Sequence, residues 1–253
     1  MSFHTQIIIK DNHVIKSYNK NCREFQIEAR ILSTVNHPHI ISALHVLSNP
    51  ASIVMPKLDQ TLSDWLEYGN TFVEKKMLYQ TKINYLGQIA SGLEYLHLNN
   101  ILHLDLKLDN IMISNHQIKL IDFGLAEYVD NGTVITTQIK CTVTHRPPEG
   151  FGQGNSSVEL GFGFDIWSFG IIMYELLFGI PIYLQSIIPS YDLDSDYLLY
   201  EQEVYLTITS DSFKFALGRI LPSYFMQCIN FNPEKRPLIS NITKNLFLLH
   251  KEL

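Results

Sequence analysis

No glycine precedes Gly69 in this 253-residue chain. Backbone amides approach a phosphate closely only where side chains do not intrude, and glycine is the residue that permits this. The first part of the sequence therefore excludes a glycine-rich phosphate-binding loop of the GxGxxG type.

Cysteine is scarce, and its pattern argues against a disulfide framework and against a cysteine metal site. Cys22, Cys141 and Cys228 are an odd number, lie far apart and lack the spacing of metal ligands. The polar start MSFHTQ also lacks the apolar core of a signal peptide. We therefore expect an intracellular protein in a reducing compartment, either cytoplasmic or nuclear.

Runs of lysine or arginine are absent, and the formal net charge is -6. This balance argues against nucleic acid as a partner, because polyanion-binding surfaces are basic. Hydrophobic residues make up 46% of the chain and charged residues 17%, which is enough to build a large core. One globular unit, or two closely packed lobes, is expected.

An apolar stretch at residues 164–184 has the length of a membrane span, but its contents favour another interpretation. It contains Asp165, Glu175 and Pro181. Ionised groups are costly inside a bilayer, whereas a buried helix tolerates them when they have partners. We expect a core helix and no membrane span.

The first part of the chain has the pattern of a small β-rich unit. Two β-branched runs at residues 5–10 and 13–18 flank the turn dipeptide Asp11–Asn12, which predicts a hairpin. Residues 23–35 have apolar side chains near helical spacing and end before His37–Pro38. Residues 52–55 predict another strand.

From residue 76 onward the pattern becomes helical. Residues 76–98 predict a long amphipathic helix, and residues 111–113 and 118–121 predict a hairpin around Asn115–His116. The segments beyond Glu149 look mostly helical. The expected fold class is therefore α+β, with a small β-rich lobe, a larger helical lobe and a seam near residues 56–60.

The residues that carry chemistry are concentrated in HLDLKLDN at residues 103–110 and in Asp122-Phe123-Gly124. Asp105, Asn110 and Asp122 lie on loops beside the predicted hairpin, where their side chains can converge. Two oxygen donors near a phosphate suit Mg²⁺, and a third carboxylate can accept a hydroxyl proton.

The two motifs, in this order after a long amphipathic helix, resemble those of the eukaryotic-type protein kinase family from about residue 2 to the C-terminus. The resemblance implies one bilobal kinase domain over residues 1–253. Its N-lobe, residues 1–57, would be truncated, without the first strand and the glycine-rich loop. Residues 58–253 would form a complete helical C-lobe.

The resemblance also assigns roles in the catalytic loop. Asp105 would be the catalytic base, Lys107 would steady the transferring phosphate, and Asn110 and Asp122 would bind the metal. The implied cofactors are ATP with Mg²⁺ or Mn²⁺. Lysine two residues after the base is the Ser/Thr pattern, so the implied substrate is a protein with a serine or threonine acceptor.

Other matches concern the segment before Glu149. Thr142 falls where Ser/Thr kinases place a threonine that contacts the base and the neighbouring lysine, although it could also be an ordinary loop residue. The string THRPPE resembles the TxxxRxPE pattern of the cyclin-dependent kinase group. By the same resemblance, Glu149 would pair with Arg236 as a structural tie, and Asp165 would brace the catalytic loop.

Nucleotide-binding residues are expected in the small lobe. Met55 would be the gatekeeper, and Pro56 to Leu58 the hinge that binds adenine through backbone groups. Glu28 would pair with the phosphate-binding lysine, unless it is a solvated helix charge. Lys16 is favoured over Lys10 for that lysine, because it lies on the strand that leads into the Glu28 helix.

The sequence departs from the family in two places. Met1-Ser2-Phe3-His4 aligns with only the later half of a glycine-rich loop, which predicts weak nucleotide binding and either a natural truncation, as in viral kinases, or a longer reading frame. Leu104 replaces an arginine that normally meets a phosphate on the activation loop.

A rival hypothesis follows from the missing glycine-rich lid. The chain would then be a kinase-derived binding module that pairs with or decoys a host kinase. A host kinase or an activating partner is accordingly an expected partner beside the protein substrate.

Overall fold

The computed structural model describes residues 5–19, 21–68, 75–136, 139–151, 157–178 and 226–252, and each structural statement refers to these. Two sequence predictions lie outside the described residues: the alignment of Met1–His4 with part of a glycine-rich loop, and the end of the apolar stretch at residues 179–184.

The small lobe contains a four-stranded antiparallel sheet with the strand order β1-β2-β4-β3. The strands are β1 (Gln6–Ile9), β2 (His13–Ser17), β3 (His45–Ser48) and β4 (Ala51–Pro56). The predicted hairpin is confirmed as β1 and β2, and the predicted strand at residues 52–55 is confirmed as β4. Strand β3 was not predicted, because all four of its side chains are exposed and it shows no alternation of buried and exposed positions.

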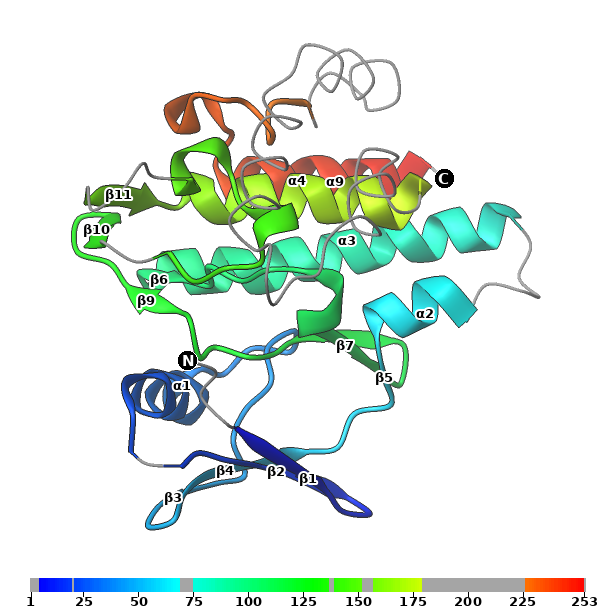
Figure 1. Cartoon of the computed structure of the whole chain (residues 1–253). Coiled ribbons are helices and arrows are strands. Elements are labelled where there is room, and N and C mark those ends of the chain that lie inside the picture. The colour runs from blue at the N-terminus through cyan, green and yellow to red at the C-terminus, as the bar shows by residue number, and fades with distance from the viewer. Residues whose placement is uncertain are drawn as a thin grey trace, which may run out of the picture.

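Helix α1 (Arg23–Thr34) lies beside this sheet, as Figure 1 shows. Phe25, Ala29 and Leu32 are buried at helical spacing, and Val35 ends the helix in an extended conformation. The predicted helix is therefore confirmed. Glu28 is buried on the same helix, so a polar residue shares its apolar face.

The large lobe consists mainly of helices, which lie together at the other end of the molecule in Figure 1. They are α2 (Leu62–Tyr68), α3 (Lys75–Leu98), α4 (Gly163–Phe178) and α9 (Ile239–Glu252). The predicted long helix is confirmed as α3, which packs against α4 and α9. Its core face includes Ile83, Leu86, Ile89 and Leu93.

Helix α4 covers most of the apolar stretch noted in the sequence. Its side chains from Phe164 to Leu176 are all buried within the lobe, so the core-helix interpretation holds for this helix. In the described part of the chain, no helix combines the length and the apolar content that crossing a bilayer requires.

A second predicted hairpin is confirmed as β7 (Ile111–Ser114) and β8 (Gln117–Leu120). Asn115 and His116 form its two-residue turn, with φ values of 50° and 62°. Positive φ at both central residues is the geometry that matches the twist of a tight hairpin. The short strand β5 (Gln60–Thr61) pairs with β7.

Beyond Glu149 the described elements are mostly helical, as expected, and one short strand stands among them. Strand β11 (Val158–Gly161) pairs with β10 (Thr133–Thr136), and a further short pair joins β6 (Ile101–Leu102) to β9 (Glu127–Tyr128). Such short strands carry little periodicity of their own, and their pairing depends on tertiary contacts. The predicted α+β class, with a strand-rich lobe and a helical lobe, is confirmed.

Candidate active site

The β7–β8 hairpin brings two of the predicted metal-binding residues to the same end. Ile111 pairs with Leu120, and the Ile121 amide donates to the Asn110 carbonyl at 3.0 Å. Asn110 therefore lies just before the first strand, and Asp122 lies just after the second, at the open end of the hairpin. The antiparallel register explains why residues twelve positions apart in the sequence meet here.

Asp105 lies in the loop between β6 and β7, where four donor groups surround its carboxylate. The Thr142 hydroxyl and amide donate to Oδ1 at 2.7 and 2.8 Å. Asn110 Nδ2 donates to Oδ2 at 2.9 Å, and Lys107 Nζ lies 3.3 Å from the same oxygen. These contacts fix the direction of the carboxylate.

The protonation state of Asp105 follows from these neighbours. Burial raises its pKa, but the Lys107 charge and the Thr142 hydrogen bonds outweigh burial, so the pKa lies below its ordinary value. Asp105 is therefore ionised near neutral pH. It can accept a hydrogen bond from an incoming hydroxyl and orient it.

Thr142 is not an ordinary loop residue in this structure. Its hydroxyl donates to Asp105 and accepts a hydrogen bond from Lys107 Nζ at 2.7 Å. One hydroxyl thus links the carboxylate and the ammonium group. The segment before Glu149 is held against the catalytic loop by this contact.

Lys16 lies on β2, the strand between β1 and β4, and forms two ion pairs. Its Nζ atom is 2.7 Å from Glu28 Oε2 and 2.7 Å from Asp122 Oδ1. Lys10 instead lies in the turn after β1, where its amide donates to the His13 carbonyl. Of the two candidate lysines, Lys16 is the one that the structure places beside Glu28. Because Glu28 is fully buried, it is not a solvated helix charge.

One lysine between two carboxyl groups separates their pKa values. Partial burial raises the pKa of Asp122. The charge and hydrogen bond of Lys16 lower this pKa by more than burial raises it, so the pKa of Asp122 lies below its ordinary value. Burial raises the pKa of Glu28 above its ordinary value, because the opposing Lys16 charge is shared and Asp122 adds a like charge. Burial lowers the pKa of Lys16, yet its two carboxyl partners raise it overall.

Tyr18 is a site residue that the sequence reasoning missed. Its hydroxyl donates to Glu28 Oε2. Its ring packs edge-on against the Phe25 ring, with 5.3 Å between the two ring centres. Tyr18 follows Lys16 by two positions, so the period of a strand places both on one face, and this signal could have found it. Glu28 Oε1, by contrast, is buried and has no partner among the described residues.

Asp165 braces the loop that contains Asp105 through hydrogen bonds to its backbone, as the resemblance implied. Its carboxylate accepts hydrogen bonds from the His103 and Leu104 amides, both at 2.9 Å, and lies 3.0 Å from His97 Nε2. Complete burial raises its pKa, but the His97 contact and the backbone amides lower it below the ordinary value. The two residues before Asp105 are therefore fixed by a buried carboxylate.

Arg236 and Glu149 form the expected second tie. The guanidinium contacts both oxygens of Glu149, with Nη2 at 2.7 Å from Oε2, and it also donates to the Gly163 and Asn230 carbonyls. The ring of Trp167 lies 5.1 Å from the guanidinium carbon. The arginine side chain is completely buried.

The predicted hinge residues join the two lobes. Met55 is buried on β4, Pro56 ends that strand, and Leu58 is half-buried against the core. The Leu58 amide and carbonyl form no hydrogen bond with other described residues. Free backbone groups at this position suit the edge of an adenine ring.

The donor set fits a hard divalent cation that nucleotide phosphates also bind. Asp122 is 45% exposed. Asn110 uses its Nδ2 for Asp105, which leaves its side-chain oxygen Oδ1 for a cation. Within the described ranges, no cluster of three or more His, Cys, Asp or Glu side chains has metal-binding geometry. Two oxygen ligands suit Mg²⁺, because it takes its remaining ligands from phosphates and water.

Comparisons with known proteins identify the family to which this chain belongs. The protein kinase domain model matches residues 4–248. The chain is 30% identical to "Probable serine/threonine-protein kinase PLK" of Dictyostelium discoideum over 233 residues, which cover 89% of this chain and 22% of that protein.

Two further relatives match less well, one because its identity is lower and the other because its match covers less of this chain. "Cyclin-dependent kinase-like 2" of Mus musculus is 25% identical over 87% of this chain and 42% of its own length, and "Tyrosine-protein kinase FRK" of Homo sapiens is 30% identical over 64% and 32%. The chain thus spans less than half the length of these relatives. Because the family model covers nearly the whole chain, the protein belongs to the protein kinase family.

Proposed function

We propose that this chain is a Ser/Thr protein kinase, which transfers the γ-phosphoryl group of Mg-ATP to hydroxyl groups of intracellular proteins. The observation that carries the proposal is the Thr142 hydroxyl, which donates to Asp105 and accepts from Lys107. This contact places a carboxylate and an ammonium group side by side, as hydroxyl orientation and phosphate-charge stabilisation require.

Each residue then has a physical role. Asp105 accepts a hydrogen bond from the acceptor hydroxyl, and Lys107 neutralises charge on the transferring phosphate. Asp122 and Asn110 would hold Mg²⁺, which supplies charge neutralisation between the outer phosphates when bound. Lys16, held by Glu28, would contact the inner phosphates, and the hinge from Met55 through Pro56 to Leu58 would bind adenine.

The proposed preference for serine or threonine acceptors rests on Lys107. Lys107 and Thr142 occupy space directly beside Asp105. A short acceptor side chain must bring its hydroxyl close to the carboxylate, and this arrangement suits such a side chain. A tyrosine kinase is among the relatives, so the acceptor has to be measured directly.

The test is transfer of radiolabel from ATP by matched, folded protein. Loss of the metal ligand should be the most severe change, so Asp122→Asn should abolish transfer to casein. Asp105→Asn should lower the rate by about two to four orders of magnitude, the scale of a positioned base. Asp109→Asn is the matched control, because Asp109 is exposed in the same loop.

The outcomes separate an enzyme from a binding module. Phosphoamino-acid analysis of labelled casein should detect phosphoserine or phosphothreonine. Equal labelling by wild type and both site variants would reveal a contaminating kinase. The absence of transfer by folded wild type would contradict the proposal and favour a non-catalytic module.

A further inference from the structure

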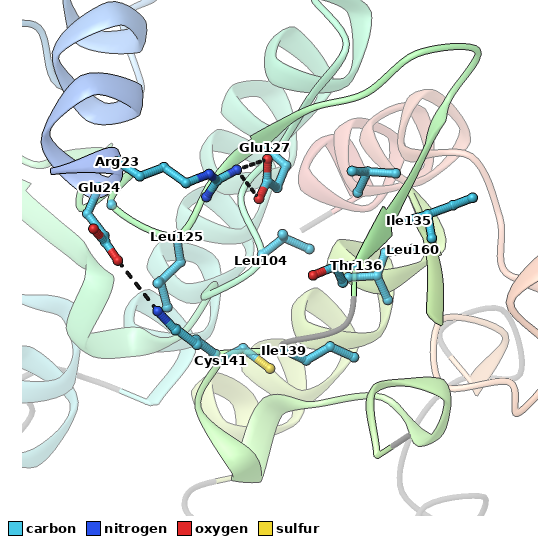
Figure 2. A pocket seen from close by; sticks show the side chains of 13 residues that line it. Arg23, Glu24, Leu104, Leu125, Glu127, Ile135, Thr136, Ile139, Cys141 and Leu160 are labelled. Atoms are coloured by element: carbon cyan, nitrogen blue, oxygen red, sulfur yellow. Dashed lines mark hydrogen bonds and ion pairs between the residues drawn. The ribbon is translucent and has the colours of Figure 1, made fainter. Parts of the chain in front are cut away.

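A pocket of about 340 Å³ lies beside the active centre, and its four charged lining residues are already paired with one another (Figure 2). Arg23 contacts both carboxylate oxygens of Glu127, a pair that Figure 2 shows, and Lys140 Nζ lies 3.6 Å from Glu24 Oε1. The pocket therefore leaves no unpaired charged side chain for a ligand. A row of backbone groups without a partner lies elsewhere, on the outer edge of the small-lobe sheet.

Strand β1, dark blue in Figure 1, forms that edge, because β2 is its one neighbour among the described strands. The Lys10 amide donates to the His13 carbonyl at 2.9 Å, so the hairpin closes with a hydrogen-bonded pair. Hydrogen-bonded and non-bonded pairs alternate along an antiparallel ladder, so Ile8 is the next β1 residue that bonds to β2. The N–H and C=O groups of Ile7 and Ile9 therefore point away from the sheet.

These outward groups of Ile7 and Ile9 have no hydrogen-bond partner in the described part of the chain. A regular strand with a bare edge is a template for another strand, and proteins usually protect such an edge with a lysine, a proline or a bulge. Residues 6–9 contain no lysine or proline, and their register with β2 is unbroken. The edge is therefore open to a further strand.

The side chains of β1 add apolar surface at the same place. Ile7 and Ile9 are 61% and 65% exposed on one face, and Ile8 is 36% exposed on the other. Apolar surface that leaves water on association contributes most of the affinity between proteins. The occupant of this edge should therefore be an uncharged strand with apolar side chains.

A second copy of β1 meets this requirement without a charge conflict. If two copies pair antiparallel about a two-fold axis at Ile8, then Ile7 lies opposite Ile9 of the partner copy. All outward N–H and C=O groups of these residues then bond across the axis, and their four side chains gather on one face. Lys10 lies opposite Gln6 of the partner copy, so the two lysines do not face each other.

We propose that this chain forms a two-fold symmetric dimer through β1, which joins the two small-lobe sheets into one continuous sheet. Each copy contributes one short strand, so the contact is small and a Kd of roughly 1–100 µM is expected. The inference goes beyond the proposed kinase function and does not depend on it, because its test measures mass and not phosphoryl transfer.

The first test is sedimentation velocity of the purified chain at about 1 to 200 µM, where the average mass should rise from monomer toward dimer. Ile8→Lys places two ammonium groups opposite each other on the axis and should raise Kd by at least about tenfold. Val46→Lys on β3 is the matched control, because Val46 is also 36% exposed and lies on the other edge strand. It should leave the dimer unchanged.

A charge exchange tests the two-fold axis itself. Ile8→Glu alone should be as monomeric as Ile8→Lys, because like charges again face each other. An equal mixture of the two variants should form a heterodimer with a Kd within about threefold of wild type, since opposite charges now meet. A mixture that stays monomeric would contradict this register.

Ile9→Pro tests the backbone pairing independently of charge. Proline removes the outward N–H of residue 9, which β2 does not use, so the hairpin should keep its melting temperature while the dimer is lost. This variant also decides the matter if Ile8→Lys proves unstable.

Three results would overturn the inference: a wild-type chain that stays monomeric throughout, a dimer that survives both Ile8→Lys and Ile9→Pro, or a dimer that Val46→Lys weakens equally.

Discussion

Two buried carboxyl groups, one in each lobe, are stabilised in opposite ways. Asp165 in the large lobe accepts hydrogen bonds from two backbone amides and contacts His97, and its pKa is lowered. Among the described residues, Glu28 in the small lobe has only side-chain partners, Lys16 and Tyr18, and its pKa is raised. Both residues are completely shielded from solvent.

The difference shows that the kind of partner matters more than the degree of burial. Backbone amides are fixed by the fold, so they stabilise the Asp165 charge at all times. Lys16 is shared with Asp122, and one Glu28 oxygen has no partner in the described residues. The large lobe therefore contains a permanent brace, whereas the small lobe contains an arrangement that can change.

Removal of the brace should have the largest effect on stability. Asp165→Ala leaves the amides of His103 and Leu104 buried without an acceptor, together with His97. We expect the free energy of unfolding to fall by about 3–5 kcal/mol, as when one partner of a buried pair is lost. Urea unfolding followed by circular dichroism measures this change. Asp165→Asn, which keeps one acceptor oxygen, should lose less, and equal losses would contradict the interpretation.

The second large-lobe tie should rank next. Arg236→Ala leaves Glu149 without its partner, and Glu149 is 19% exposed. Some water can reach that carboxylate, so we expect a loss of about 3 kcal/mol, at the low end for buried pairs. Thermal melting, with Lys235→Ala beside it as an exposed neighbour, provides the measurement. An unchanged melting temperature would show that the two groups do not meet in solution.

Tyr18→Phe sharpens the comparison in the small lobe. The substitution removes one hydroxyl donor from Glu28 and keeps the ring contact with Phe25. We expect a loss of about 1 kcal/mol in the free energy of unfolding, the usual net value of one hydrogen bond. The affinity for ATP, measured by fluorescence of a labelled analogue, should also fall because Glu28 is less well oriented. A loss of stability above 3 kcal/mol would mean that Tyr18 is part of a permanent brace.

Glu28→Gln should produce the smallest change and differ in sign from Asp165→Ala. Because the folded-state pKa of Glu28 is raised, its stabilising contribution is present below pH about 4.3 and is lost as pH rises through the folded pKa. At pH 8 the neutral glutamine should therefore match or slightly exceed wild-type stability, while phosphoryl transfer falls. Melting curves between pH 4 and pH 8 test this, and a lower melting temperature for the variant at pH 8 would contradict it.

The sequence predicted the parts of the fold whose signals are local. The hairpin turn at Asn115–His116, the helix that ends before Pro38 and the apolar face of α3 each carry their own pattern. The positions of Asp105, Asn110 and Asp122 also indicated a common site, because all three lie on loops beside one predicted hairpin. The short strands β6, β9, β10 and β11 could not be predicted, since only their partners in space define them.

Pairings between distant side chains were the other limit of sequence reasoning. Nothing near Arg23 in the sequence indicates Glu127 as its partner, and Leu104 showed only that an arginine was missing. Lys16 was preferred over Lys10 on strand order alone, and the contact with Glu28 depends on how α1 lies against the sheet. The roles of these residues in catalysis stay predictions.

Leu104 and Asp122 hold their backbones in the left-handed region, with φ values of 65° and 60°. For residues with a β-carbon this conformation costs roughly 1–2 kcal/mol each, and it persists only where the surroundings enforce it. One of these residues directly precedes Asp105, and the other is itself a candidate metal ligand. A peptide that contains residues 103–124 alone would relax to ordinary backbone angles, so this active centre cannot be transplanted as a loop and exists only while the large lobe is folded around it.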